Sequence, residues 1–193
     1  GEEIHLSNDK GLSTNKKLFI DYSRLTNDLK IDDLVLIDDG KIKLKVKTVN
    51  ERSIVCNILN GGTLNSRKGI NLPKTELTFK SLTKKDKEDL NFLIKHEVDW
   101  VALSFVRTSK DILELRNILS KRKSDIKIIA KIEKPEAVKN IKSITRSSDA
   151  IMIARGDLGI EIPMQKVPIV QKKIISSCIH YSKPVVVATQ MME

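Results

Sequence analysis

Apolar and polar residues alternate with a period of two through the first third of the chain. Residues 41–49 read KIKLKVKTV, with a lysine at every other position up to residue 47. This alternation is typical of a β-strand that has one face in water. An apolar run at 34–38 leads into Asp39-Gly40, a dipeptide that favours a tight hairpin, and residues 53–59 form another β-rich run. The pattern predicts a small antiparallel β domain.

From about residue 73 the pattern changes to apolar runs that alternate with amphipathic helices. WVALSF at 100–105 is typical of a strand that is buried on both faces, which makes Trp100 a packing residue. The spacing of roughly 25 to 35 residues between runs is typical of βαβ units and a parallel sheet. Strands are predicted at 100–105, 126–133, 150–154 and 184–189, and helices after Thr83 and at 111–123, 135–144 and 167–181.

Polar residues gather where these apolar runs end. Parallel sheets and βα barrels place their sites at the carboxyl ends of strands. A closed ring would direct such residues from successive strands to one mouth, whereas an open sheet would bring together only those beside its switch point. A complete barrel needs about 250 residues, so this chain cannot close one by itself. The residues concerned are Ser104, Lys131, Glu133, Asp157 and Thr189.

Two short clusters carry the candidate chemistry. In a strand, Lys131 and Glu133 share a face while Ile132 points back into the core. Asp157 occupies the same relative position about one βα unit later. Two carboxylates beside an ammonium suit a divalent cation that holds an anionic phosphoryl substrate. Strand ends are often polar and merely solvated, so each cluster alone leaves both interpretations open.

Composition narrows the class of protein. The formal charge of +10 is compatible with nucleic-acid binding, but aromatic residues make up only 4% of the chain, which leaves little for base stacking. No apolar stretch approaches the roughly 20 residues of a membrane span, and the N-terminus does not read as a secretion signal. Cys56 and Cys178 lack CxxC spacing, so two reduced core thiols and a cytoplasmic location are expected.

Seven short strings follow one another along the chain: DDG (38–40), NGG (60–62), SRKGINLP (66–73), ALSFVR (102–107), IIAKIEKPEA (128–137), IMIARGDLGIEIP (151–163) and VVVATQMME (185–193). In this order and spacing they resemble the pyruvate kinase family along essentially the whole chain. The resemblance implies an α/β fold, an incomplete TIM-type (β/α)8 barrel segment preceded by a small antiparallel β lid domain. Residues 1–72 would be the lid, or B domain, without its start, and 73–193 would be barrel strands four to seven.

The resemblance also implies an activity. That family transfers the phosphoryl group of phosphoenolpyruvate to ADP, giving ATP and pyruvate, with Mg²⁺ or Mn²⁺ and in many members K⁺, whose ligands would lie outside this chain. Glu133 and Asp157 would ligate the divalent metal. Lys131 would be catalytic, stabilising charge on the phosphoryl group and the enolate. Thr189 would be catalytic near the face of the enolate that is protonated and would contact the substrate, and Arg155, Gly156 and Asp157 would bind it with Lys131.

Further expectations concern the lid and the partners. Lys68 would reach the phosphates of ADP or ATP, with Asp39 near the closing interface. The resemblance implies a homotetrameric parent enzyme in the cytoplasm, with neither nucleic acid nor membrane as a partner. The family's first three barrel strands would precede Gly1, and its last strand would follow Glu193, so the chain is expected to be an inactive fragment.

The chain departs from the family pattern at 77–80 and at Lys134-Pro135-Glu136. Two alternatives stay open at this point. One is a Mg²⁺-dependent aldolase or lyase acting on pyruvate or phosphoenolpyruvate, because related barrels also hold Mg²⁺ with a Glu and an Asp. The other is a non-catalytic binding fragment. The inserted β domain favours the kinase, since a lyase needs no nucleotide-closing domain.

Overall fold

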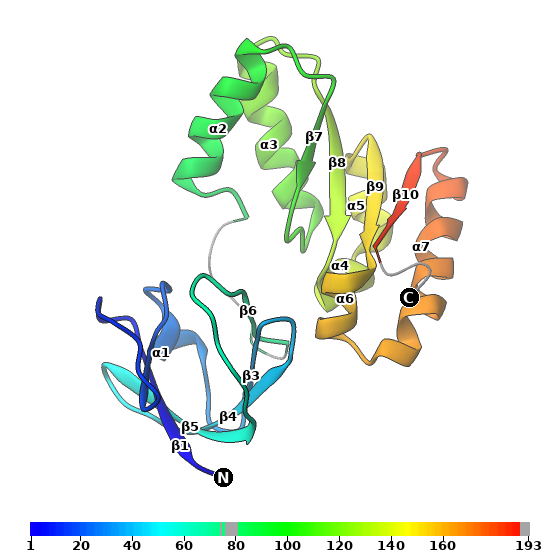
Figure 1. Ribbon diagram of the computed structural model, residues 1–193. Coiled ribbons are helices and arrows are strands. Elements are labelled where there is room, and N and C mark those ends of the chain that lie inside the picture. Colours follow the sequence, from blue (N-terminus) through cyan, green and yellow to red (C-terminus); the bar gives the residue numbers. More distant parts are fainter. Residues whose placement is uncertain (74, 76–80, 190–193) are drawn as a thin grey trace. The chain divides into compact units, whose positions relative to one another are not determined.

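The computed structural model describes residues 1–73, 75 and 81–189, which form two compact units (Figure 1). One unit holds the described residues up to 75, and the other holds residues 81–189. Each unit has its own cluster of buried apolar side chains. Within the described ranges, no helix has both the length and the apolar character to cross a membrane.

The first unit is a six-stranded sheet in the order β2-β1-β5-β4-β3-β6. Its pairs are antiparallel as predicted, except that β1 and β2 run parallel. In β4 the apolar positions Ile42, Leu44 and Val46 are buried, so the period of two places one face on the core. Its elements are β1 (Glu3–Ser7), β2 (Lys17–Phe19), α1 (Leu25–Asp28), β3 (Leu34–Ile37), β4 (Ile42–Val49), β5 (Ser53–Asn60) and β6 (Ile70–Asn71).

The predicted hairpin joins β3 to β4, with a wider loop than a two-residue turn. Ile37 pairs with Ile42, so four residues form the connection. Asp38, Asp39 and Gly40 all have left-handed backbones, with φ of 51°, 57° and 81°. Asp and Gly tolerate this region better than most residue types, which explains why the turn falls here.

The second unit contains a four-stranded parallel sheet in the order β10-β9-β8-β7, as predicted. Helices α3, α5 and α7 pack in sequence beside one another, with α3 against β8 and α7 against β9 (Figure 1). Its strands are β7 (Trp100–Leu103), β8 (Lys127–Ile132), β9 (Ala150–Ala154) and β10 (Val185–Ala188). Its helices are α2 (Lys84–Lys95), α3 (Ser109–Lys121), α4 (Pro135–Lys139), α5 (Ile141–Ser147), α6 (Arg155–Glu161), η1 (Met164–Lys166) and α7 (Val167–His180).

Helix boundaries follow local chemistry. Thr83 caps α2 through a capping box with Asp86, as its sequence position predicts. The single helix expected at 135–144 is instead two helices, α4 and α5, which meet at Asn140. The Asn140 side chain donates a hydrogen bond of 3.0 Å to the carbonyl oxygen of Arg107, and this bond ties the break to the loop after β7.

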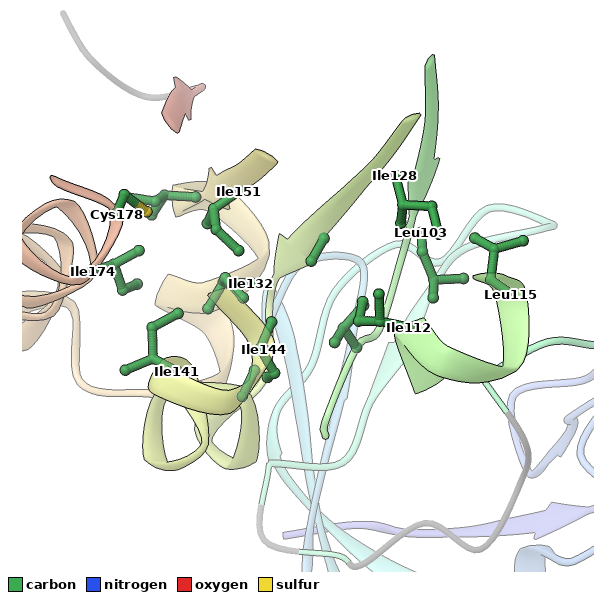
Figure 2. Close-up of a cluster of buried hydrophobic side chains, with 14 of the residues drawn as sticks. Leu103, Ile112, Leu115, Ile128, Ile132, Ile141, Ile144, Ile151, Ile174 and Cys178 are labelled. Carbon is green, nitrogen blue, oxygen red and sulfur yellow. The ribbon is translucent and has the colours of Figure 1, made fainter. Parts of the chain in front are cut away.

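The core of the second unit lies between the sheet and its helices. Figure 2 shows Ile132 and Ile151 from the inner strands near Ile144 and Ile174 from α5 and α7, whereas Ile128 lies on the side of Leu115 from α3. These branched side chains are wholly buried, which accounts for the nearly continuous apolar runs of β8 and β9.

The expectation for residues 100–105 is wrong in part. Trp100 is 45% exposed and Phe105 is 43% exposed, so the run is not buried on both faces and Trp100 is not a core packing residue. In the described sheet β7 has a neighbour, β8, on one side only. A cavity of about 460 Å³ lies between β7 and α2 and is lined by Leu103 and Ser104 among others.

Candidate active site

Lys131 and Glu133 form an ion pair at the carboxyl end of β8. The distance from Lys131 Nζ to Glu133 Oε1 is 2.6 Å, and Ile132 between them is fully buried. The predicted alternation along the strand is therefore confirmed. The Glu133 side chain is only 2% exposed and that of Lys131 is 24% exposed, so the ammonium is the part of the pair that reaches solvent.

The loop after β7 holds both members of this pair. Lys131 Nζ donates to Ser104 Oγ at 3.0 Å, and the backbone N–H of Phe105 donates to Glu133 Oε2 at 2.7 Å. Both carboxylate oxygens of Glu133 are thus engaged, as a buried charge requires. Phe105 makes this contact through its backbone N–H, which every residue type except proline has. The identity of residue 105 therefore gave no sign of the contact in the sequence.

Asp111 anchors the same loop from the first turn of α3. Its carboxylate accepts hydrogen bonds from Ser81 Oγ and from the backbone N–H groups of Arg107 and Thr108. Burial alone would raise the pKa of Asp111, but these hydrogen bonds outweigh it, so the pKa lies below the ordinary value. The loop that carries Ser104 and Phe105 is therefore fixed at its far end.

A second cluster joins the ends of β9 and β10. Helix α6 begins at Arg155, directly after β9 ends at Ala154. The backbone N–H of Gly156 donates to Thr189 Oγ1 at 3.2 Å, so these two predicted substrate-binding residues are brought together. Asp157 lies exposed in the first turn of α6, where the helix dipole favours a carboxylate. Arg155 is half-buried.

A buried ion pair connects the segments that follow β8 and β9. Lys134 Nζ lies 2.5 Å from Glu161 Oε1, and the two side chains are 8% and 1% exposed. In the sequence, Lys134 stands out only as a departure from the family pattern, and no role is predicted for Glu161. A role for these two residues could have been suspected from their positions. Lys134 directly follows Glu133, and Glu161 lies one helical turn after Asp157.

Glu133 and Asp157 fit the donor chemistry of a hard divalent cation. They follow the ends of the neighbouring strands β8 and β9. Within the described ranges, no group of three or more His, Cys, Asp or Glu side chains is placed to hold a metal ion. Mg²⁺ commonly uses one or two protein carboxylates and completes its octahedron with water and substrate phosphates. Two carboxylates are therefore a sufficient protein contribution.

The predicted nucleotide residues lie in the first unit. Lys68 Nζ is 2.8 Å from Asp38 Oδ1, and Lys41 Nζ is 3.2 Å from Asp38 Oδ2. The hydrogen bond to Lys68, and then that to Lys41, lowers the pKa of Asp38, while Asp38 raises the pKa of Lys68. Lys68 thus pairs with Asp38, and the predicted Asp39 is the next residue of the same turn.

The fold and these groups define a class of protein: a segment of a parallel βα barrel with charged side chains at the carboxyl ends of its strands. A family profile described as "Pyruvate kinase, barrel domain" matches residues 1–193. The chain belongs to the pyruvate kinase family.

Individual relatives agree with this assignment. Proteins named pyruvate kinase from Staphylococcus aureus strains MRSA252 and USA300 are each 43% identical over 195 residues, which cover 100% of this chain and 33% of the relative. A crystal structure of a pyruvate kinase from Cryptosporidium parvum matches with a TM-score of 0.92 and 39% identity, covering 100% of this chain and 41% of that one. The chain thus spans about a third of the length of its curated relatives.

Proposed function

We propose that the complete protein containing this chain transfers the phosphoryl group of phosphoenolpyruvate to ADP, giving ATP and pyruvate. Family membership supports this activity, and the observation that carries it is the Lys131–Glu133 pair at the end of β8. Because the chain spans about a third of its relatives, the activity belongs to the complete protein. These 193 residues alone are proposed to be inactive.

Glu133 and Asp157 would hold Mg²⁺ or Mn²⁺. When bound, the ion supplies positive charge that neutralises phosphoryl oxygens and helps to orient the substrate. The burial of Glu133 supports this role, because a carboxylate with 2% exposure already depends on nearby positive charge and donors. K⁺ is a possible second ion, with ligands outside this chain.

Lys131 would stabilise the negative charge that develops on the phosphoryl group and on the enolate. Phosphoryl transfer depends mainly on positioning and electrostatic stabilisation. Contacts with Ser104 and Glu133 hold the ammonium before substrate arrives, so little reorganisation is needed at the moment of transfer. This preorganisation supports Lys131 as the catalytic cation.

Arg155, Gly156, Asp157 and Thr189 would bind the substrate. The hydrogen bond between Gly156 and Thr189 supports a shared site at the ends of β9 and β10. Thr189 is proposed to lie near the face on which the enolate takes up its proton, with its hydroxyl able to donate or accept there.

We assign residues 1–72 to a lid, or B domain, and 73–193 to the partial barrel. Lys68, oriented by Asp38, would bind the phosphates of ADP or ATP, with Asp39 near the closing interface. Lid closure would exclude water during transfer. We also propose that the complete protein is a homotetramer without nucleic-acid or membrane partners. A cytoplasmic location is proposed as well, because the two buried free thiols suit a reducing compartment.

An assay coupled to lactate dehydrogenase on the complete protein tests this function. We expect ADP-dependent pyruvate release, and Lys131→Met should lower kcat at least about 100-fold because it removes a charge aimed at the transition state. Lys127→Met is the matched control, since Lys127 is exposed at the opposite end of the same strand and should leave kcat unchanged. Pyruvate release from a 2-keto acid without nucleotide would instead favour the lyase.

A further inference from the structure

The ion pair between Lys134 and Glu161 is almost completely buried, and removing its two charges from water costs free energy. Its two side chains are 8% and 1% exposed, and its atoms approach to 2.5 Å. Desolvating an ammonium and a carboxylate consumes most of their mutual attraction, so such a pair adds little net stability compared with apolar residues of similar volume. Its directional contact, in contrast, fixes the relative position of two segments.

The two segments are those that carry the proposed metal ligands. Lys134 follows Glu133 directly and is the N-cap of α4, with an extended backbone at φ −118° and ψ 147°. Extended geometry sends the two side chains to opposite sides, so Glu133 faces Lys131 while Lys134 is free to reach α6. The position of Glu133 and the anchor of Lys134 are therefore coupled through one peptide unit.

Glu161 has an equivalent relation to Asp157. It is the last residue of α6, and Asp157 lies four residues earlier in the first turn. Residues four apart lie on the same face of a helix, one turn from each other. The contact of Glu161 with Lys134 therefore restrains the rotation of α6 about its axis, and with it the position of Asp157.

We infer that Lys134 and Glu161 are positioning residues that set the relative position of the Glu133 and Asp157 carboxylates for the divalent metal. This inference rests on the proposed function, because it takes these two carboxylates as the metal ligands. Groups that orient metal ligands typically change metal affinity or activity 10- to 100-fold when they are removed. A pair with only a structural role would change stability and leave the metal affinity unaltered.

The test measures Mn²⁺ binding to the complete protein without substrate, from the electron paramagnetic resonance signal of free Mn²⁺. The main variant is Lys134→Met/Glu161→Leu, which removes both charges and leaves no unpaired ion in the core. We expect its Kd for Mn²⁺ to rise about 10-fold or more. The Mg²⁺ concentration that gives half-maximal activity should rise in parallel, and Lys134→Arg, which keeps the pair, should retain most of the affinity.

Arg116 and Asp149 provide a matched control at the opposite end of β8. Arg116 Nη1 lies 2.9 Å from Asp149 Oδ2, which also accepts the backbone N–H of Ile128 at 2.8 Å. Arg116→Met/Asp149→Asn removes an ion pair that joins α3 to the start of β9, at the end of β8 opposite to Glu133. We expect a lower unfolding temperature and an unchanged Kd for Mn²⁺.

An unchanged Kd for Mn²⁺ in folded Lys134→Met/Glu161→Leu would overturn the inference. Should the double variant not fold, Lys134→Leu/Glu161→Met, a second pair of apolar side chains that leaves no unpaired ion, decides by the same criterion at a temperature where its circular dichroism is native. The proposed function fails separately, if the unaltered complete protein shows no ADP-dependent pyruvate release. A weakened Mn²⁺ affinity in the variant would still support the positioning role in that case.

Discussion

Two residues with left-handed backbones occupy the ends of the outer strands of the described parallel sheet. Phe105 has φ of 54° and Thr189 has φ of 63°. For residues with a side chain this conformation costs roughly 1–2 kcal/mol and persists only where the surroundings impose it. Phe105 directs its N–H to Glu133, and Thr189 accepts from Gly156, so each unfavourable backbone serves a contact within the candidate active site.

Gly40 is the position where a left-handed backbone most clearly requires glycine. Its φ is +81°, and a Cβ there would meet nothing within 4 Å, so any cost of Gly40→Ala is conformational. We expect Gly40→Ala to lower the free energy of unfolding by about 1 kcal/mol, measured by urea denaturation. Gly69→Ala is the control, because Gly69 has equal space and no left-handed φ, and it should cause no loss.

At the scale of single residues, the sequence predicted local side-chain geometry but not contacts between residues far apart in the chain. The shared face of Lys131 and Glu133 followed from strand periodicity, because it depends only on local geometry. The bond from Phe105 to Glu133 spans 28 residues and depends on the path of a loop. The Lys134–Glu161 pair spans 27 residues and depends likewise on how two segments pack, so neither contact could be predicted from local pattern.

Helices and strands were predictable where one local signal decided them. The capping box of Thr83 and Asp86 fixed the start of α2, and apolar spacing fixed α3. The burial of β7 was predicted wrongly, because an apolar run has the same pattern whether one face of the strand is covered or both, and here Trp100 and Ala102 lie on an exposed face. The division of 135–144 at Asn140 was missed because it accompanies a contact with the distant Arg107 loop.

Asp111 links the start of α3 to the loop of the candidate active site, and its contribution depends on pH. Its folded pKa lies below the ordinary value of 3.8, so the carboxylate stabilises the fold above about pH 4. This contribution is lost as pH falls through the lower, folded pKa. We expect Asp111→Asn to lower the free energy of unfolding by about 2 kcal/mol at pH 7.

The difference between Asp111→Asn and the unaltered protein should shrink as pH falls below about 4, because the unfolded carboxylate then takes up a proton more readily than the native one. Denaturant unfolding at several pH values measures this difference. Asp125→Asn is the control, since Asp125 is exposed and should leave the curve unchanged. A constant difference between pH 7 and pH 3 would contradict the assignment.

The molecule as a whole consists of two units, each with a separate core and one buried cysteine. Cys56 lies in the core of the first unit and Cys178 in that of the second, so the expectation that both are core residues is confirmed. The alternation of strand-rich and βα patterns predicted two such regions. The boundary between residues 72 and 73 rests on the change of hydrophobic period there and stays a prediction.

The two thiols should report the unfolding of each unit. Burial raises the pKa of Cys56 to about 12 and that of Cys178 to about 11, so neither forms much thiolate at pH 8. We expect neither to react with an aromatic disulfide reagent in the native protein and both to react in guanidinium. Mass spectrometry after partial denaturation identifies which unit opens first, and fast native labelling of either thiol would contradict their burial.

The sheet order has a further consequence for the 193-residue polypeptide produced on its own. Within the parallel sheet, β8 and β9 are bonded on both sides, whereas β7 and β10 each have one neighbour among the described strands. Of these four strands, β8 and β9 should therefore exchange their amide hydrogens with deuterated solvent most slowly, and β7 and β10 should fray first. The exposed margins also offer unpaired backbone groups to other chains, so the isolated polypeptide is prone to self-association by strand addition.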